Sequence, residues 1–360
     1  MKKEKLNIKK IASEMIISII VGVFIGIFLV FLEYTKNINL MDFSILHLLL
    51  FALIAFLTSI FIHELGHLVM GLLTGYHFLS FRFLNIHVQK DVDGKFKFYS
   101  YWIPSTLGQC LMKPSENITH FCYHFGGVFF NILISLISVM IIMITGNKLL
   151  IQFLIVMILV NLGVGKMNWM SFKGVLNDGH NYRLIKNNPK TKKAITYLLD
   201  MNAHLSEGHE METYDIEPII SLDLKGEDTI QLNVLMYLVQ YYQLKFDSEN
   251  YQHYTELAYQ NLKGPSTILS LLIETDYYFM RLLLGYEDAG KYKTKNVERI
   301  LKSISKQESV LLMRMIETYI LEKRFDEDLY HAFLIQCEKS TTKGLAKSLQ
   351  NYAEKIISLF

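Results

Sequence analysis

Two histidines and one glutamate form a pattern that can build a metal site, in the stretch Ser59-Ile-Phe-Ile-His-Glu-Leu-Gly-His-Leu-Val-Met70. On a helix, His63 and His67 leave the same face about one turn apart, so both imidazoles can bind one metal ion. Glu64 is offset by one position, where a carboxylate can take a proton from water without being a ligand itself. The three residues therefore predict a zinc site with its own general base.

The segment that carries this pattern is strongly apolar. Between Asp42 and Arg82, Glu64 is the only formally charged residue. A charged side chain at the centre of a membrane helix costs roughly 2.5–3.5 kcal/mol on insertion scales, so stability does not explain it. We therefore expect a functional metal site inside a membrane helix, and we favour this interpretation over a chance match to the pattern.

Long apolar runs predict a membrane domain in residues 1–180 and a soluble cytoplasmic domain in residues 181–360. A secretory signal peptide is the alternative for the first run, but no small-residue cleavage site follows it. Lysines are in excess before the first run and after the last, which predicts that both termini are cytoplasmic. The four predicted spans are residues 15–33, 43–76, 121–145 and 149–167.

Composition narrows the class of protein. The chain of 360 residues has a formal net charge of +2 and no long basic run, so nothing indicates a nucleic-acid partner. Its three cysteines are too few and too scattered for a disulfide framework or a cysteine-based zinc site. The abundance of Lys, Ile and Asn is typical of a bacterium with an AT-rich genome, so a bacterial cell membrane is the expected location.

Between the second and third spans the hydrophobic period changes to that of a strand. Apolar and polar residues alternate in residues 84–89 and again in Lys95-Phe-Lys-Phe98, with Asp93-Gly94 between them. This pattern predicts a β-hairpin at about residues 81–99, near the cytoplasmic face of the membrane.

The second half of the chain has the pattern of successive helices. We expect one helix break at Gly264-Pro265, with Ser266 or Thr267 as the next cap, and another at Asp326. Helices separated by short breaks suggest stacked hairpins of the tetratricopeptide kind, although no clean 34-residue signature is present. The predicted fold is therefore mainly α: a four-span membrane domain with a small β-hairpin insertion, followed by a soluble helical, tetratricopeptide-like domain.

A catalytic zinc ion usually has three protein ligands, so a third residue must complete the site. The favoured candidate is Asp178, just past the cytoplasmic end of the fourth span, because the second and fourth spans both reach that side. Gly179 would let the backbone turn sharply beside the metal. Three glutamates are less favoured candidates: Glu116, Glu207 and Glu210.

Further polar residues lie in the third span. Asn131 could hydrogen-bond a substrate backbone, or it could form an interhelical hydrogen bond where Gly126 and Gly127 allow close packing. His120 and His124 also share a helical face. They lack an intervening acid and a third partner, so we interpret them as packing residues.

Together these motifs resemble the site-2 protease family of intramembrane zinc metalloproteases. Over about residues 43–180 they occur in the family's order: His63-Glu64-x-x-His67, then Gly127-x-x-x-Asn131, then Asp178-Gly179. The chain departs from the family pattern at Val128 and Ser171, where proline is usual, and at Asn177, which intervenes before Asp178. For residues 190–360 the resemblance implies nothing.

The resemblance implies a zinc-dependent endopeptidase that cleaves a membrane-embedded or membrane-associated polypeptide near the cytoplasmic face. Its expected partners are the lipid bilayer and a membrane protein or peptide substrate. One alternative is a membrane-anchored scaffold with a non-catalytic zinc site, whose helical domain binds a protein partner. A second is a membrane zinc protease of the prenyl-protein type, whose third ligand is a downstream glutamate.

Overall fold

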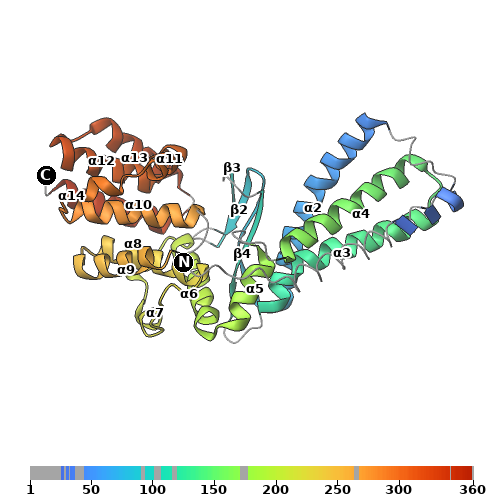
Figure 1. Cartoon of the computed structure of the whole chain (residues 1–360), viewed down its shortest axis with the longest axis horizontal. Helices are drawn as coiled ribbons and strands as arrows, with labels where there is room; N and C mark the ends of the chain where they lie inside the picture. The colour runs from blue at the N-terminus through green and yellow to red at the C-terminus, as the bar shows by residue number, and fades with distance from the viewer. Residues whose placement is uncertain are drawn as a thin grey trace. The chain divides into compact units, whose positions relative to one another are not determined.

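The computed structural model describes residues 26–27, 30–31, 33–36, 44–90, 94–100, 107–115, 120–170, 177–262, 267–340 and 342–358 (Figure 1). The chain divides into two compact units. The first comprises Met1–Ser59 and Ile132–Gly163, and the second comprises Ile60–Asn131 and Val164–Phe360. Three long helices belong to both units, since each begins in one and ends in the other.

These helices are long and apolar enough to cross a membrane: α2 (Ile45–Leu73), α3 (His120–Ile144) and α4 (Lys148–Trp169). Helices are therefore present where the second, third and fourth spans were predicted, with ends that agree to within a few residues. Most of the predicted first span, residues 15–33, lies outside the described residues. Three membrane-length helices are thus established in the described part of the chain, and the four-span topology stays a prediction.

The first unit is a small apolar bundle. Phe51 and Ala55 of α2 pack against Val156 and Met157 of α4. The outer sides of the helices carry exposed apolar residues such as Met140, as expected for a surface that lipid covers. Ile134 of α3 packs against the same cluster, so these contacts join the parts of α2, α3 and α4 that lie in the first unit.

A four-stranded antiparallel sheet follows α2 in the second unit, in the order β3-β2-β1-β4. Its strands are β1 (Tyr76–Phe83), β2 (Ile86–Lys90), β3 (Phe96–Ser100) and β4 (Gly108–Pro114). The β2–β3 pair, with Val88 opposite Phe98, confirms the hairpin. The prediction was incomplete, however, because β1 and β4 were not foreseen.

Strand β1 runs back along the helix that precedes it. The Phe61 ring of α2 makes edge contacts with the rings of Phe81 and Phe83, at centroid distances of 5.9 and 5.5 Å. Between β1 and β2, Leu84 adopts a left-handed φ of 55°, so the strand expected to begin there begins at Ile86 instead. The sheet therefore returns from the end of α2 toward the level of the histidines.

The rest of the second unit is helical and is drawn from green to red in Figure 1. Its α-helices are α5 (Asp178–Asn187), α6 (Pro189–Ser206), α7 (Glu217–Ile220), α8 (Thr229–Leu244), α9 (Ser248–Gln260), α10 (Ile268–Leu283), α11 (Lys295–Ser303), α12 (Glu308–Glu322), α13 (Glu327–Lys339) and α14 (Lys343–Ile357). Two 3₁₀ turns, Met211–Thr213 and Ala289–Tyr292, lie between them.

Two of the predicted helix starts are confirmed. Thr267 caps α10 in a capping box with Ser270, and the Asp326 side chain accepts a hydrogen bond from the backbone N–H of Leu329 at the start of α13. Helix α14 packs back against α6, whereas in an open solenoid each repeat contacts only its neighbours. The relation to tetratricopeptide repeats therefore stays a prediction.

A partly buried acid predicts that the stability of the helical part of the chain depends on pH. Burial raises the pKa of the partly buried Asp276 on α10 to about 7. Between pH 4 and 7 the folded state then binds more protons than the unfolded state, so the free energy of unfolding falls as pH rises, by at most about 4 kcal/mol. Asp276→Asn should remove this slope in thermal unfolding of the detergent-solubilised protein at pH 5 and 8. An unchanged slope would contradict the assignment.

Candidate metal centre

Three side chains meet at one point in the second unit. His63 and His67 leave the same face of α2, and Asp178 is the first residue of α5. The Asp178 Oδ2 atom lies 3.0 Å from Nε2 of His63 and 3.2 Å from Nε2 of His67. The two Nε2 atoms are 3.2 Å apart. The structure thus brings together the three residues that the sequence nominated as metal ligands.

The opposite nitrogens of the two imidazoles are held by acceptors. The Nδ1–H of His67 donates to the backbone carbonyl of Tyr123 at 2.7 Å. The Nδ1–H of His63 donates to the Oδ1 atom of Asn131, also at 2.7 Å. A neutral imidazole that carries its proton on Nδ1 has a lone pair on Nε2. Both lone pairs therefore face the Asp178 carboxylate, and such hydrogen bonds are typical of metal-ligating histidines.

This donor set fits a divalent cation. In a tetrahedral site with ligand distances of about 2.0–2.1 Å, neighbouring ligand atoms lie about 3.3–3.4 Å apart, close to the separations found here. Two neutral imidazoles and one carboxylate would supply the lone pairs and the single negative charge that such a cation accepts.

Glycines bring α2 and α3 into backbone contact beside these ligands. A Cβ atom added to Gly66 would lie 2.3 Å from the backbone oxygen of Gly126. One added to Gly127 would lie 2.5 Å from Nε2 of His63. Close approach of this kind is characteristic of small residues at helix crossings in membranes. It allows Asn131 and Tyr123 of α3 to reach the two histidines of α2.

Glu64 of α2 follows His63 directly, and its side chain contacts the start of β4. A Cβ atom added to Gly108 would lie 2.6 Å from Cγ of Glu64 and 2.7 Å from its Oε1. The edge strand of the sheet therefore begins against the predicted general base. This strand lies outside the predicted hairpin at residues 81–99, so the part of the sheet nearest Glu64 was missed.

Asp178 is held in place by its neighbour Asn177. The Asn177 side chain caps α5 by accepting a hydrogen bond from the backbone N–H of His180 at 2.9 Å. Its Nδ2 atom donates to the carbonyls of Met167 and Met170, at the end of α4. Asn177, which departs from the family pattern, thus ties Asp178, the candidate third ligand, to the end of α4.

Gly179 has a different role from the one expected. Its φ is not among the positive values, so no left-handed turn occurs beside the ligands. Instead, a Cβ atom at Gly179 would lie 2.0 Å from the carbonyl oxygen of Trp169. Gly179 therefore permits close contact between α5 and the end of α4.

We expect Asn177→Ala to weaken metal binding. It removes a helix cap that contributes about 1 kcal/mol and the two bonds to α4, and loss of a residue that orients a ligand typically lowers metal affinity about 10- to 100-fold. Competition with a zinc-binding dye would measure this. The matched control is Asn188→Ala, which removes the cap of α6. Equal zinc affinity in both variants would contradict the role of Asn177.

The three glutamates that were less favoured as ligands lie away from the histidines or outside the described residues. Glu210 pairs with Lys347, and Glu207 lines a cavity beside α6, so neither joins the cluster of histidines. Glu116 is not among the described residues. For Asn131, the interhelical hydrogen bond is present, and contact with a substrate stays a prediction.

Four contributors to the site were missed. The Tyr123 carbonyl could not be found from sequence, because a backbone atom carries no residue signal. The glycines at positions 66 and 108 also show their role only through the atoms that approach them. A signal did exist for Asn177, since an asparagine before an Asp-Gly pair is a typical helix cap.

Two histidines on a membrane-length helix and the first residue of α5 thus form a possible metal site beside a glutamate. The chain belongs to peptidase family M50, the site-2 protease family, whose model matches residues 51–355. The match covers most of residues 43–180, which carried the resemblance, and also most of the helical part that follows. No curated protein and no solved structure matches the chain.

Proposed function

We propose that the protein is a zinc-dependent endopeptidase that cleaves a membrane-embedded or membrane-associated polypeptide near the cytoplasmic face. The observation that carries this proposal is the convergence of His63, His67 and Asp178 beside Glu64. Membership of a family of intramembrane metalloproteases supports it.

The proposed location follows from the helices. His67 lies six residues before the end of α2, which is about 9 Å of helix rise, and Asp178 lies beyond the end of α4. We propose that these ends face the cytoplasm of a bacterial cell and that both termini lie there, as the excess of lysines indicates.

In this proposal, each side chain of the site has one task. A zinc ion at this site would lower the pKa of a water molecule and polarise the scissile carbonyl. Glu64 accepts the proton of the attacking water and passes it to the leaving amine. His63, His67 and Asp178 hold the metal, Asn131 and the Tyr123 carbonyl orient the imidazoles, and Gly108 leaves room for Glu64.

A substrate helix must become extended before cleavage, because its carbonyls are hydrogen-bonded within the helix. An edge strand can hold such a segment by strand addition. We propose β4 for this role, since it is at the edge of the sheet and begins against Glu64. Membrane-tethered regulators, leftover signal peptides and small peptide precursors are all compatible substrates.

The test is a comparison of membrane peptide fragments from cells that produce the wild-type protein or the Glu64→Gln variant. A proteolytic function predicts fragments that appear only with the wild-type protein and disappear when zinc is chelated. Identical fragments in both cells, with zinc bound to the purified protein, would instead support a scaffold with a non-catalytic zinc site.

A further inference from the structure

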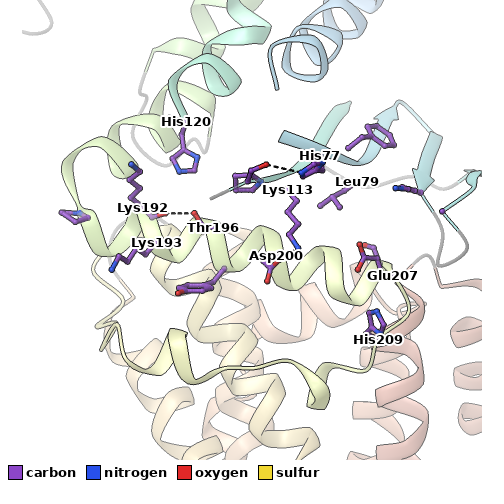
Figure 2. Close-up of a pocket in the computed structure, with 18 residues that line it drawn as sticks. His77, Leu79, Lys113, His120, Lys192, Lys193, Thr196, Asp200, Glu207 and His209 are labelled. Atoms are coloured by element: carbon purple, nitrogen blue, oxygen red, sulfur yellow. Dashed lines mark hydrogen bonds and ion pairs between the residues drawn. The ribbon is translucent and has the colours of Figure 1, made fainter. Parts of the chain in front are cut away.

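A second polar site lies between the sheet and α6. It is a cavity of about 1150 Å³. Its walls come from the start of β1, the end of β4, the first residue of α3 and one face of α6 (Figure 2). None of the residues in the metal centre lines it, so it is a separate site.

One end of the cavity carries positive charge, and no acid among the described lining residues is paired with it. Lys192 and Lys193 of α6 line it there, and neither forms an ion pair among the described residues (Figure 2). Lys113 is different, because it is paired with Asp200. Acidic Glu207 lies toward the other end, next to His209 (Figure 2).

A buried histidine points into this basic end. His120 is 5% exposed, and its Nδ1 atom is hydrogen-bonded to the Tyr76 hydroxyl at 2.6 Å. In the tautomer in which the Tyr76 hydroxyl donates to Nδ1, the imidazole carries its own proton on Nε2 and presents a donor to the cavity. Lys192 lies close enough to His120 for its charge to act on the ring (Figure 2).

One buried donor and two lysine ammonium groups around a cavity form a site for an anion with several acceptor oxygens. His120 also begins a helix long enough to span the membrane, so the site borders the membrane surface. Lysines next to a membrane attract anionic lipid head groups. A phosphate group fits both the donors and this location.

We propose that this cavity binds a phosphate ester, with the phosphate at His120, Lys192 and Lys193. The source is either an anionic phospholipid head group or a soluble phosphorylated molecule of the same chemistry. This inference does not depend on proteolysis, so it can fail or succeed independently of the proposed function.

The test uses the full-length protein in neutral detergent with two probes, glycerol 3-phosphate followed by calorimetry and phosphatidylglycerol followed by native mass spectrometry. We expect saturable binding of at least one probe. Lys192→Ala and His120→Gln should each weaken that binding about ten-fold, because each removes one donor to a charged oxygen. Lys192→Arg should retain most of it.

Lys190→Ala is the matched control. Lys190 is on the same helix but outside the cavity, and its ammonium donates to the Asp223 carbonyl. Binding of the lipid alone assigns the site to a head group, and binding of glycerol 3-phosphate alone assigns it to a soluble ligand. Absence of saturable binding of both probes, or an equal loss in Lys190→Ala, would overturn the proposal.

Discussion

Glu64→Gln should lower the rate of peptide cleavage about 10²- to 10⁴-fold while leaving the zinc content unchanged. Glutamine keeps the shape of the side chain but cannot accept the proton of the attacking water. Metal binding should survive, because the converging atoms belong to His63, His67 and Asp178. The rate is measured with the purified protein in proteoliposomes, and zinc is measured by elemental analysis of the same preparation.

The control for this variant is Glu207→Gln, which changes the same side chain outside the metal centre and should leave the rate unaltered. Full activity in Glu64→Gln would show that another group is the base. Loss of zinc together with activity would show that Glu64 is itself a ligand.

Gly127→Ala should abolish activity through geometry alone. The new methyl group would lie 2.5 Å from the Nε2 and Cε1 atoms of His63, so either the imidazole moves or the two helices separate. Because the ring is already fixed by Asn131, movement also breaks a buried hydrogen bond. We expect zinc affinity to fall at least about 10-fold, as it does when a group that orients a ligand is removed.

Gly163→Ala is the matched control, since it makes the same change in a membrane helix where an added Cβ meets no atom within 4 Å. Zinc affinity should stay at the wild-type value in this variant. A Gly127→Ala protein with normal affinity would mean that α2 and α3 are farther apart than the structure shows.

The three candidate ligands were predictable from residue spacing and from the predicted topology. His63 and His67 are one turn apart on any helix, and Asp178 was found by following which helix ends share a side of the membrane. The hydrogen-bond partners of the two histidines were harder to predict from the sequence. Asn131 was nominated as a polar residue in an apolar helix, but its hydrogen bond to His63 depends on how α2 and α3 cross.

The sheet shows where pattern reasoning fails. Strand β1 follows α2 after a short turn and is itself apolar, so its first residue was assigned to the preceding span. Strand β4 contains Cys110 and Met112 and ends in Pro114, and none of these gives a strong strand signal. Both strands exist because they pair with each other and pack on α2, which are long-range contacts.

Helix starts in the second half were predictable from capping chemistry alone. Thr267 and Asp326 satisfy the backbone N–H groups of the turns they precede, whatever the tertiary fold. The packing of α14 on α6 could not be predicted in this way, because it joins residues far apart in the chain. The hydrophobic periodicity of a helix does not show which other helix it contacts.

The most direct test of the central claim is the zinc content of the purified wild-type protein and of Asp178→Ala, measured side by side after dialysis against a weak chelator. The metal centre described above predicts about one zinc ion per wild-type chain and loss of most of it in Asp178→Ala, while Glu207→Ala keeps its metal. Retention of zinc by Asp178→Ala, or its loss from Glu207→Ala, would contradict the assignment of Asp178 as the third ligand.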